Sequence, residues 1–249
     1  MSTQTEARTT MVYEGKAKRI WHTPDSTLHI VEYTDRATAF NGEKHANIEH
    51  KGALNNQISA HFMELLHDAG IPTHFVRILS KIEQLVRAVT IVPLEVVVRN
   101  IVAGSLAARS GLDEGAHIDQ PVVEFYYKRD DLGDPLLTRA HIGMLGLADD
   151  TTLDTLTTLA LSTNTVLRQY LETCGVTLVD FKLEFGHTAE GELLLADEIS
   201  PDTCRFWDSA TGRKLDKDRF RRDMGDVGEA YAELLSRLVP DAITVGSAS

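Results

Sequence analysis

The sequence is poor in cysteine and proline and has no long apolar run. It contains 2 cysteines and 7 prolines in 249 residues. Cys174 and Cys204 form no CxxC pair and no ladder of metal-ligand spacing, which disfavours a disulfide scaffold or a structural zinc site and favours a reducing cytoplasm. The longest apolar runs, such as residues 91–98, fall far short of the roughly 18 residues that span a bilayer. The first ten residues lack the apolar core of a signal peptide, so we expect a cytoplasmic protein with no membrane partner.

Positive charge is also scarce. Lysine and arginine number 25 against 37 aspartate and glutamate residues, which gives a net charge of −12. Such a surface repels nucleic acid, so we expect no nucleic-acid partner. The 43% of hydrophobic residues is enough for a substantial core and excludes disorder of the whole chain.

The length and the order of the expected elements bound the fold. A chain of 249 residues suits one large domain or two small lobes that share a cleft. Strand-like runs crowd the first third, and long helical patterns follow. We therefore expect an α+β fold with an antiparallel β-rich N-terminal lobe over residues 1–90. An α/β C-terminal lobe should cover residues 91–249, with the active site in the cleft between them.

Apolar periodicity and turn residues define the main elements. Helices are expected over residues 54–70, 105–111, 149–174 and 218–238. Strands are expected over residues 75–79, 82–98 with a break at Pro93, 176–185 and 192–199. Residues 23–26 suit a hairpin turn.

The most informative stretch reads DFKLEFG…LADEISPD. On a strand, Asp180, Lys182 and Glu184 share one face. If residues 190–191 form a two-residue turn, Glu184 lies opposite Asp197 on the next strand. Two carboxylates in register repel unless a cation lies between them, and such oxygen ligands suit Mg²⁺. A solvated strand face with an internal Lys182 ion pair is the alternative that the spacing leaves open.

Two further motifs suggest anion sites. In YEGKAK, Gly15 permits close backbone approach, and Lys16 and Lys18 lie on one side of the following strand, where they could grip a polyphosphate. Taken alone, this motif fits a turn flanked by surface lysines better. In VRNIVAGS, Ser105 is expected to cap a helix near Arg99, which makes an anion site or simply a capped helix with an ion-paired arginine.

Other common site patterns are missing. The sequence has no GxxxxGK[ST], GxGxxG, GxSxG or HExxH, so we expect no P-loop, Rossmann, serine-hydrolase or zinc-protease site. Two basic residues lie in loops that the motifs alone do not interpret, Lys128 and Arg205.

Taken together and in this order, the motifs resemble those of the SAICAR synthetase family. The resemblance runs from about residue 11 to residue 239 and rests on six segments: YEGKAK, VRN…AGS, DFKLEFG, DEISPD, RFWD and DKDRFR. Each segment alone is a weak indication of the family, whereas all six in the same order are a specific one.

The resemblance implies a two-lobed fold related to ATP-grasp enzymes, with ATP, Mg²⁺, L-aspartate and carboxyaminoimidazole ribonucleotide (CAIR) as ligands. It implies ATP contacts for Gly15, Lys16, Lys18 and Lys128. It implies substrate contacts for Arg99, Ser105, Arg205 and Asn41. It further implies that Glu184 and Asp197 hold Mg²⁺, that Lys182 lies by the reacting groups, and that adenine lies near residues 85–87. Family habit also suggests a homodimer.

One position departs from the family pattern. Where many members read SAFD, this chain has TAFN, so the amide of Asn41 replaces a carboxylate. An amide can donate a hydrogen bond but carries no charge.

The leading hypothesis is an ATP-dependent ligase that joins CAIR to L-aspartate through an acyl phosphate. Asp180 would accept a proton from the amine or orient Lys182, and the residues leave both roles open. A small-molecule kinase of related fold and a non-catalytic nucleotide-binding regulator are the alternatives.

Overall fold

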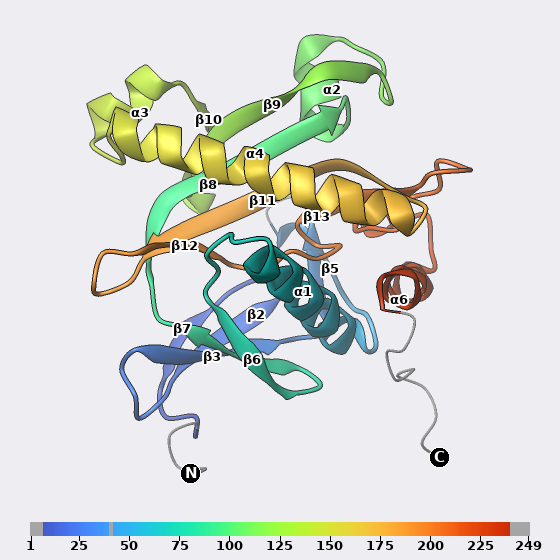
Figure 1. Ribbon diagram of the computed structural model, residues 1–249. Coiled ribbons are helices and arrows are strands. Elements are labelled where there is room, and N and C mark those ends of the chain that lie inside the picture. The colour runs from blue at the N-terminus through green and yellow to red at the C-terminus, as the bar shows by residue number, and fades with distance from the viewer. Residues whose placement is uncertain (1–6, 40–41, 240–249) are drawn as a thin grey trace, which may run out of the picture.

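Two antiparallel sheets with helices between and over them make up the molecule (Figure 1). The computed structural model describes residues 7–39 and 42–239. In that part of the chain the first sheet has the order β1-β2-β3-β7-β6. Its strands are β1 (Met11–Glu14), β2 (Lys18–His22), β3 (Leu28–Tyr33), β6 (Phe75–Ser80) and β7 (Glu83–Arg87). The expected hairpin turn joins β2 to β3, and it is closed by a hydrogen bond from Leu28 N to Asp25 O of 3.0 Å.

The second sheet has the order β10-β9-β8-β11-β12, and β13 also pairs with β11. Its strands are β8 (Thr90–Ile101), β9 (His117–Tyr127), β10 (Leu136–Leu137), β11 (Val176–His187), β12 (Leu193–Ala196) and β13 (Cys204–Asp208). All of its strand pairs are antiparallel, so the parallel sheet that an α/β C-terminal half would have is absent from the described residues. Mixed α+β describes both halves. A separate two-stranded ladder joins β4 (Arg36–Ala39) to β5 (Lys44–Asn47).

Side chains or left-handed glycines cap some of the helix ends. The helices are α1 (Lys51–Asp68), α2 (Gly104–Ser110), α3 (Arg139–Leu145), α4 (Asp150–Thr173), α5 (Asp218–Arg221) and α6 (Val227–Leu238), with a 3-10 turn η2 (Asp130–Leu132). The Asp149 carboxylate caps α4 by accepting a hydrogen bond from Thr152 N at 2.7 Å. Gly175 follows α4 in the left-handed region with φ 66°, as expected from the sequence.

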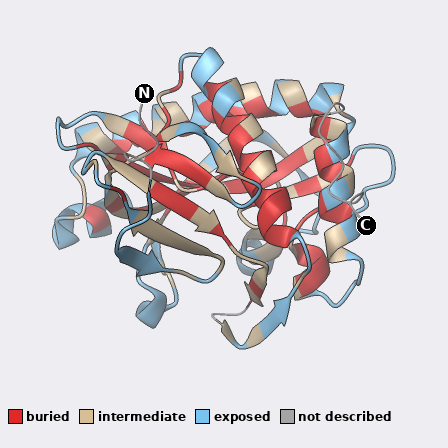
Figure 2. Ribbon diagram, turned by 90° about the horizontal axis from the view of Figure 1, so that it is seen from below, coloured by how far each residue is buried: buried red, intermediate tan, exposed pale blue. Residues whose placement is uncertain are grey.

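The core lies where α4 and α1 meet the sheets. Helix α4 lies across β8 and β11 of the second sheet, whereas α1 contacts β3, β6 and β7 of the first sheet as well as α4 and α6 (Figure 1). Residues of both helices and of the second sheet share one large buried apolar cluster, among them Phe62, Leu156, Phe181 and Phe206. Figure 2 shows the buried residues along the central strands and on the inward faces of the helices. In the described part of the chain, no helix is long and apolar enough to cross a membrane.

Three expectations about elements are wrong. The helix expected over residues 218–238 is two helices, because Asp223, Gly225 and Asp226 all have positive φ and turn the chain between α5 and α6. The strand break lies before β8 rather than at Pro93. That proline sits inside β8, in the extra residues at the register shift between β8 and β11, and a bulge tolerates a residue that cannot donate to the ladder.

The register of the β11–β12 hairpin is the third correction. Glu184 pairs with Ala196 rather than with Asp197. The connection has three residues instead of two, since Thr188 N donates to Glu192 O at 2.9 Å and Gly191 takes a φ of 87°. A three-residue loop that ends in a left-handed glycine shifts every pair by one residue. Asp197 therefore lies just past the strand end.

Candidate active site

A cavity of ≈ 490 Å³ lies between the first sheet and the β11–β12 edge of the second sheet. This volume is in the range of small-molecule sites. One wall is apolar and comes mainly from the first sheet, with Val12, Ile20, Val31, Val86 and Ile91. The opposite wall is charged and comes mainly from the second sheet and the segments after it, with Glu95, Lys128, Lys182, Glu184, Asp197, Glu198, Asp202 and Lys217.

Lys182 is at the centre of the charged wall. Its Nζ atom donates to Glu184 Oε1 at 2.5 Å and to Asp197 Oδ2 at 3.1 Å, and it lies 3.2 Å from Glu95 Oε1. Burial alone would lower the pKa of Lys182, but the three carboxylates raise it well above its ordinary value. Lys182 is therefore a fixed cation that can neutralise an anion, not a proton acceptor. Lys182 thus bridges Glu184 and Asp197, the two carboxylates predicted to hold a metal, although these residues are not paired on the β11–β12 ladder.

Asp197 is held in place through its backbone. Its φ is 63°, in the left-handed region that few residues other than glycine, asparagine and aspartate adopt. His74, buried between the two sheets, makes a hydrogen bond of 3.0 Å from its Nε2 atom to Asp197 O. Burial, followed by the charge of Lys18, lowers the pKa of His74 to about 4, so the neutral ring donates this bond at pH 7. His74 was missed at the sequence level because no local motif ties it to Asp197.

The lysines of the glycine turn and of the charged loop complete this wall. Lys18 pairs with Asp197 and lies 3.5 Å from Glu198 Oε1, whereas Lys16 contacts Asp130 at 2.8 Å. Lys128 donates to Glu184 Oε1 at 2.8 Å. All three lysines line the cavity, as does Gly15. The structure thus brings together every residue for which the sequence suggested an ATP contact.

The donor chemistry of this wall fits a divalent cation. Glu184 is buried and the Asp197 side chain is 12% exposed; both carboxylates line the same cavity and share Lys182 as partner. Mg²⁺ in nucleotide sites takes one or two carboxylates and completes its shell with phosphate oxygens and water. No group of three or more histidine, cysteine or acidic residues in the described chain could hold a metal without such help. The pair is therefore suited to a metal that arrives with a polyphosphate.

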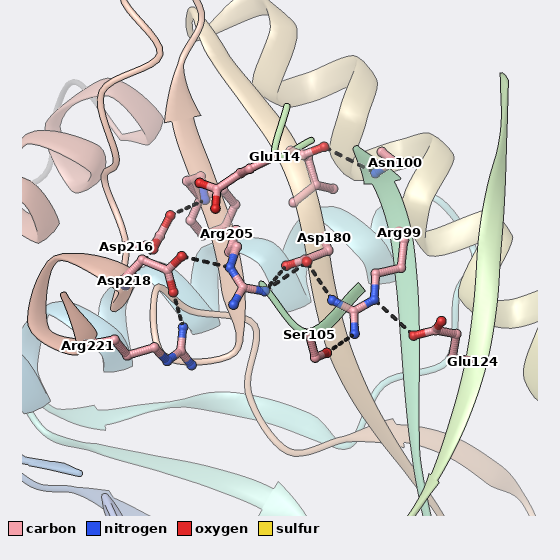
Figure 3. A network of polar contacts seen from close by, with 12 residues as sticks. Arg99, Asn100, Ser105, Glu114, Glu124, Asp180, Arg205, Asp216, Asp218 and Arg221 are labelled. Carbon is pink, nitrogen blue, oxygen red and sulfur yellow. Dashed lines mark hydrogen bonds and ion pairs between the residues drawn. The ribbon is translucent and has the colours of Figure 1, made fainter. Parts of the chain in front are cut away.

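A second charged network lies further along the same face of β11 and is centred on Asp180 (Figure 3). Arg99 Nη1 donates to Asp180 Oδ2 at 2.8 Å, and Arg205 Nη1 donates to Asp180 Oδ1 at 3.0 Å and to Oδ2 at 2.8 Å. Arg99 also donates to Glu124 Oε2 at 3.0 Å, and Arg205 donates to Asp218 Oδ2 at 2.9 Å. The partners of Asp180 in the described structure are these arginines, and Lys182 is not among them. Among the residues that the structure describes, Asp180 has no contact through which it would orient Lys182.

Ser105 belongs to this network but does not cap α2. The N-cap residue is Ala103, and no side chain caps that end of the helix, so the capping expectation is wrong. The Ser105 hydroxyl instead accepts a hydrogen bond from Arg99 Nη2 at 3.1 Å. Gly104, with φ 53°, precedes it, and a Cβ atom there would lie 2.8 Å from Arg205 Cζ. Glycine at this position therefore lets Arg205 reach over the start of α2.

Arg99, Ser105 and Arg205 thus lie together but do not line the ≈ 490 Å³ cavity. Strand β11 carries both groups, with Asp180 in one and Lys182 and Glu184 in the other. Asn41 lies outside the described residues. Sequence reasoning also missed Glu95 and Lys217, which enter the cavity from β8 and from the segment before α5.

Sequence and structure comparisons show which known proteins this chain is similar to. The family model described as SAICAR synthetase matches residues 11–238. A relative from Brevibacillus brevis, called phosphoribosylaminoimidazole-succinocarboxamide synthase, is 62% identical over 230 residues, which cover 92% of this chain and 96% of the relative. A crystal structure of the synthase from Ehrlichia chaffeensis superposes with a TM-score of 0.90 at 44% identity and covers 92% of this chain and 98% of that one. A structure described as SAICAR synthetase in complex with ADP has a TM-score of 0.90 at 47% identity and covers 93% and 98%. The chain belongs to the SAICAR synthetase family.

Proposed function

We propose that this protein is a phosphoribosylaminoimidazole-succinocarboxamide synthase of purine biosynthesis. It condenses CAIR with L-aspartate at the expense of ATP and releases SAICAR, ADP and phosphate. The observation that carries the proposal is that one strand, β11, presents two charged networks side by side. The Lys182 network suits a polyphosphate, and the network of Arg99 and Arg205 suits the phosphate of a ribonucleotide.

The proposed reaction proceeds in two steps. A carboxylate oxygen of CAIR attacks the γ-phosphorus of ATP, the bond to the β,γ-bridging oxygen breaks, and ADP leaves. The neutral amine of aspartate then attacks the acyl carbon, phosphate departs with the former carboxylate oxygen, and the amine loses a proton. The protein contributes mainly by positioning the reactants and by neutralising their charge.

The residues that line the cavity support a position for each part of ATP. The apolar side chains at Val31 and Val86 suit the adenine ring, and the neighbouring backbone of β7 suits its polar edge. Lys16, Lys18 and Lys128 would hold the phosphates, each exchanging a present carboxylate partner for a phosphate oxygen. The ADP-bound relative supports this use of the nucleotide.

Glu184 and Asp197 would hold Mg²⁺ once the nucleotide is bound. The metal would supply positive charge to the phosphate oxygens during transfer. Lys182, protonated between the same carboxylates, keeps their repulsion small while the site is free, and it provides a cation next to the reacting phosphate.

Asp180 takes a positioning role in this proposal. It holds both arginines by their guanidinium groups, so their remaining N–H donors are aimed before CAIR binds. Arg205 keeps more exposure than Arg99, with 16% against 5% of its side chain accessible, and so makes the more direct contact with phosphate.

Release of ADP with each substrate omitted in turn tests the proposal. The synthase releases ADP only when CAIR and L-aspartate are both present and forms one SAICAR per ADP. A small-molecule kinase would release ADP without aspartate and leave a phosphate ester, and a nucleotide-binding regulator would bind ATP and release none. Either of these results would replace the proposal.

The proposal extends to the domain division, the cellular compartment and the oligomeric state. A division near residue 90 would separate an ATP-binding lobe from a lobe for CAIR and metal, since the first sheet ends at Arg87 and the second begins at Thr90. The enzyme would work in the cytoplasm as a homodimer. Sedimentation equilibrium tests the dimer, and localisation of a tagged chain tests the compartment.

A further inference from the structure

Five lysines line the cavity, and one of them differs from the others in its partners. Lys16, Lys18, Lys128 and Lys182 each pair with at least one carboxylate. Lys217 also lines the cavity, yet within the described residues its ammonium group has neither a hydrogen bond nor a carboxylate within 4.0 Å. Its backbone is fixed, because Lys217 N donates to Pro201 O at 3.0 Å.

The carboxylate with the largest effect on Lys217 is that of Asp202, and it has other partners. Asp202 also lines the cavity, and its charge acts on Lys217 from beyond ion-pair distance. One of its oxygens accepts from Tyr231 Oη at 2.8 Å, and the other lies 2.6 Å from Lys51 Nζ. The side chains of Lys51 and Asp202 are only 1% and 4% exposed, so this pair is already neutral without Lys217.

Lys217 is therefore a partly buried cation with uncompensated charge. Burial, together with the positive charges of Arg221 and Lys51, lowers its pKa, and the carboxylates of Asp202 and Glu198 only partly oppose this. A desolvated cation of this kind gains most from an anion that arrives with a ligand.

The position of Lys217 indicates which ligand group it meets. On one side it faces the cavity that holds Lys18 and Asp197. On the other, the next residue, Asp218, binds Arg205 of the Asp180 network. In the proposed reaction, the CAIR carboxylate and the aspartate amine react in the space between the nucleotide phosphates and the ribonucleotide phosphate. The amino acid brings two carboxylates there and needs at least one cation that ATP and CAIR do not occupy.

We propose that Lys217 forms the carboxylate subsite for the amino-acid substrate, L-aspartate. The proposal rests on the proposed synthase function and assigns a residue to the one substrate that the motifs leave without a site. Lys217 binds a carboxylate that stays unreacted, so its contribution is to amino-acid affinity rather than to phosphoryl transfer.

The test compares Lys217→Met, which keeps the length and loses the charge, with Lys217→Arg, which keeps the charge. Steady-state ADP release gives the KM of each of the three substrates. Succinate, which has two carboxylates and no amine, serves as a competitive probe of the subsite. Lys81→Met, an exposed lysine in the turn between β6 and β7, is the control.

The expected result is a rise of about ten- to a hundredfold in the KM for aspartate in Lys217→Met, the loss of one charge-assisted contact. The inhibition constant of succinate should rise by a similar factor, while the KM values for ATP and CAIR stay within about twofold. Lys217→Arg should retain most of the affinity, and Lys81→Met should match the wild type. Thermal denaturation of each variant checks that the fold is kept, and Lys217→Gln replaces Lys217→Met if the latter does not fold.

Two results would overturn the assignment. A rise in the KM for CAIR with that for aspartate unchanged would place the carboxylate of CAIR at Lys217. A fall in kcat alone, with the succinate constant unchanged, would make Lys217 part of the chemistry. If the wild type itself releases ADP without needing aspartate, the synthase function fails, and this outcome is separate from any difference between the variants.

Discussion

At the scale of single residues, the charge state of each group in the cavity follows from its neighbours. Burial would raise the pKa of Asp197, but Lys18 and Lys182 hold it well below its usual range. The same carboxylate helps to keep Lys182 protonated. The pair therefore stays ionised across the physiological range, which suits the site proposed above for a metal and phosphate groups.

Replacing Asp197 tests the metal assignment. Asp197→Asn keeps the side-chain shape and a residue type that tolerates a φ of 63°, so the fold should remain. Loss of one charged ligand at developing phosphoryl charge should lower kcat by about 10²–10³. Kinetics over a Mg²⁺ titration provide the measurement, with Asp131→Asn, at an exposed ion pair, as control. Activity within a few-fold of the wild type would remove the assignment.

Replacing Arg99 tests the phosphate site for CAIR. In Arg99→Ala, Asp180 keeps Arg205 and Glu124 keeps Arg109 as cationic partners, so no buried carboxylate is left unpaired. We expect the KM for CAIR to rise about ten- to a hundredfold, with the KM for ATP little changed. Substrate-saturation kinetics measure both. A change in the ATP constant instead would mean that the two anion sites are exchanged.

Asp218 gives a prediction for acid stability. Burial raises its pKa, but Arg205 and Arg221 outweigh burial and lower it to about 2, against 3.8 for a free aspartate. As the pH falls, Asp218 is therefore protonated in the unfolded chain before it is protonated in the folded one. The stabilisation that its charge provides above pH 3.8 is lost as the pH falls toward 2. Between pH 5 and pH 3 the wild type should lose about 1 kcal/mol more free energy of unfolding than Asp218→Asn. Urea unfolding at both pH values checks this, and equal losses would contradict it.

Sequence reasoning located charge-bearing residues more readily than their partners. Lys182 and Glu184 share a strand face because strands alternate every two residues, which the sequence states directly. His74 and Lys217 reach the cavity from elements far from β11 in the sequence. Only the tertiary fold brings such residues together, so a single sequence contains no local signal for them.

At the scale of elements, expectations held where caps were strong. The bounds of α4 follow from the Asp149 cap and from Gly175, and they agree with the expected helix to within one residue. The β11–β12 register depended on loop length, and a difference of one residue moved Asp197 off the ladder. Backbone conformations in the left-handed region, such as that of Asp226, decided the split of the last helix.

The start of α2 offers a test at this scale. Gly104→Ala places a Cβ atom against the Arg205 guanidinium and should raise the KM for CAIR. Gly111→Ala, at the other end of α2, has a φ of 71° and no neighbouring atom within 4 Å, so it is a matched control for backbone strain. Both variants should lose about 1–2 kcal/mol of stability, measured by urea unfolding. Equal KM values for CAIR in the two variants would show that Gly104 has no role beyond its backbone.

At the scale of the whole molecule, basic residues at the site nearly balance the acidic residues around them, although the chain as a whole is acidic. The chain carries a net charge of −12, yet its proposed substrates are all anions. The lysines and arginines at the cavity and around Asp180 therefore provide the positive charge, and all but Lys217 among the cavity lysines pair with a carboxylate that a substrate phosphate can replace. In such a site, substrate binding is needed to separate the lysines and arginines from their carboxylate partners. Reaction is therefore favoured only when all ligands are present.

The central claim is that the site activates the CAIR carboxylate with ATP before the amine attacks. CAIR labelled with ¹⁸O in its carboxylate tests this most directly, with the phosphate product analysed by mass spectrometry after turnover with ATP and L-aspartate. The account predicts one ¹⁸O atom in each phosphate released, because the attacking carboxylate oxygen leaves with phosphorus. Phosphate that carries no label, formed together with SAICAR, would contradict it.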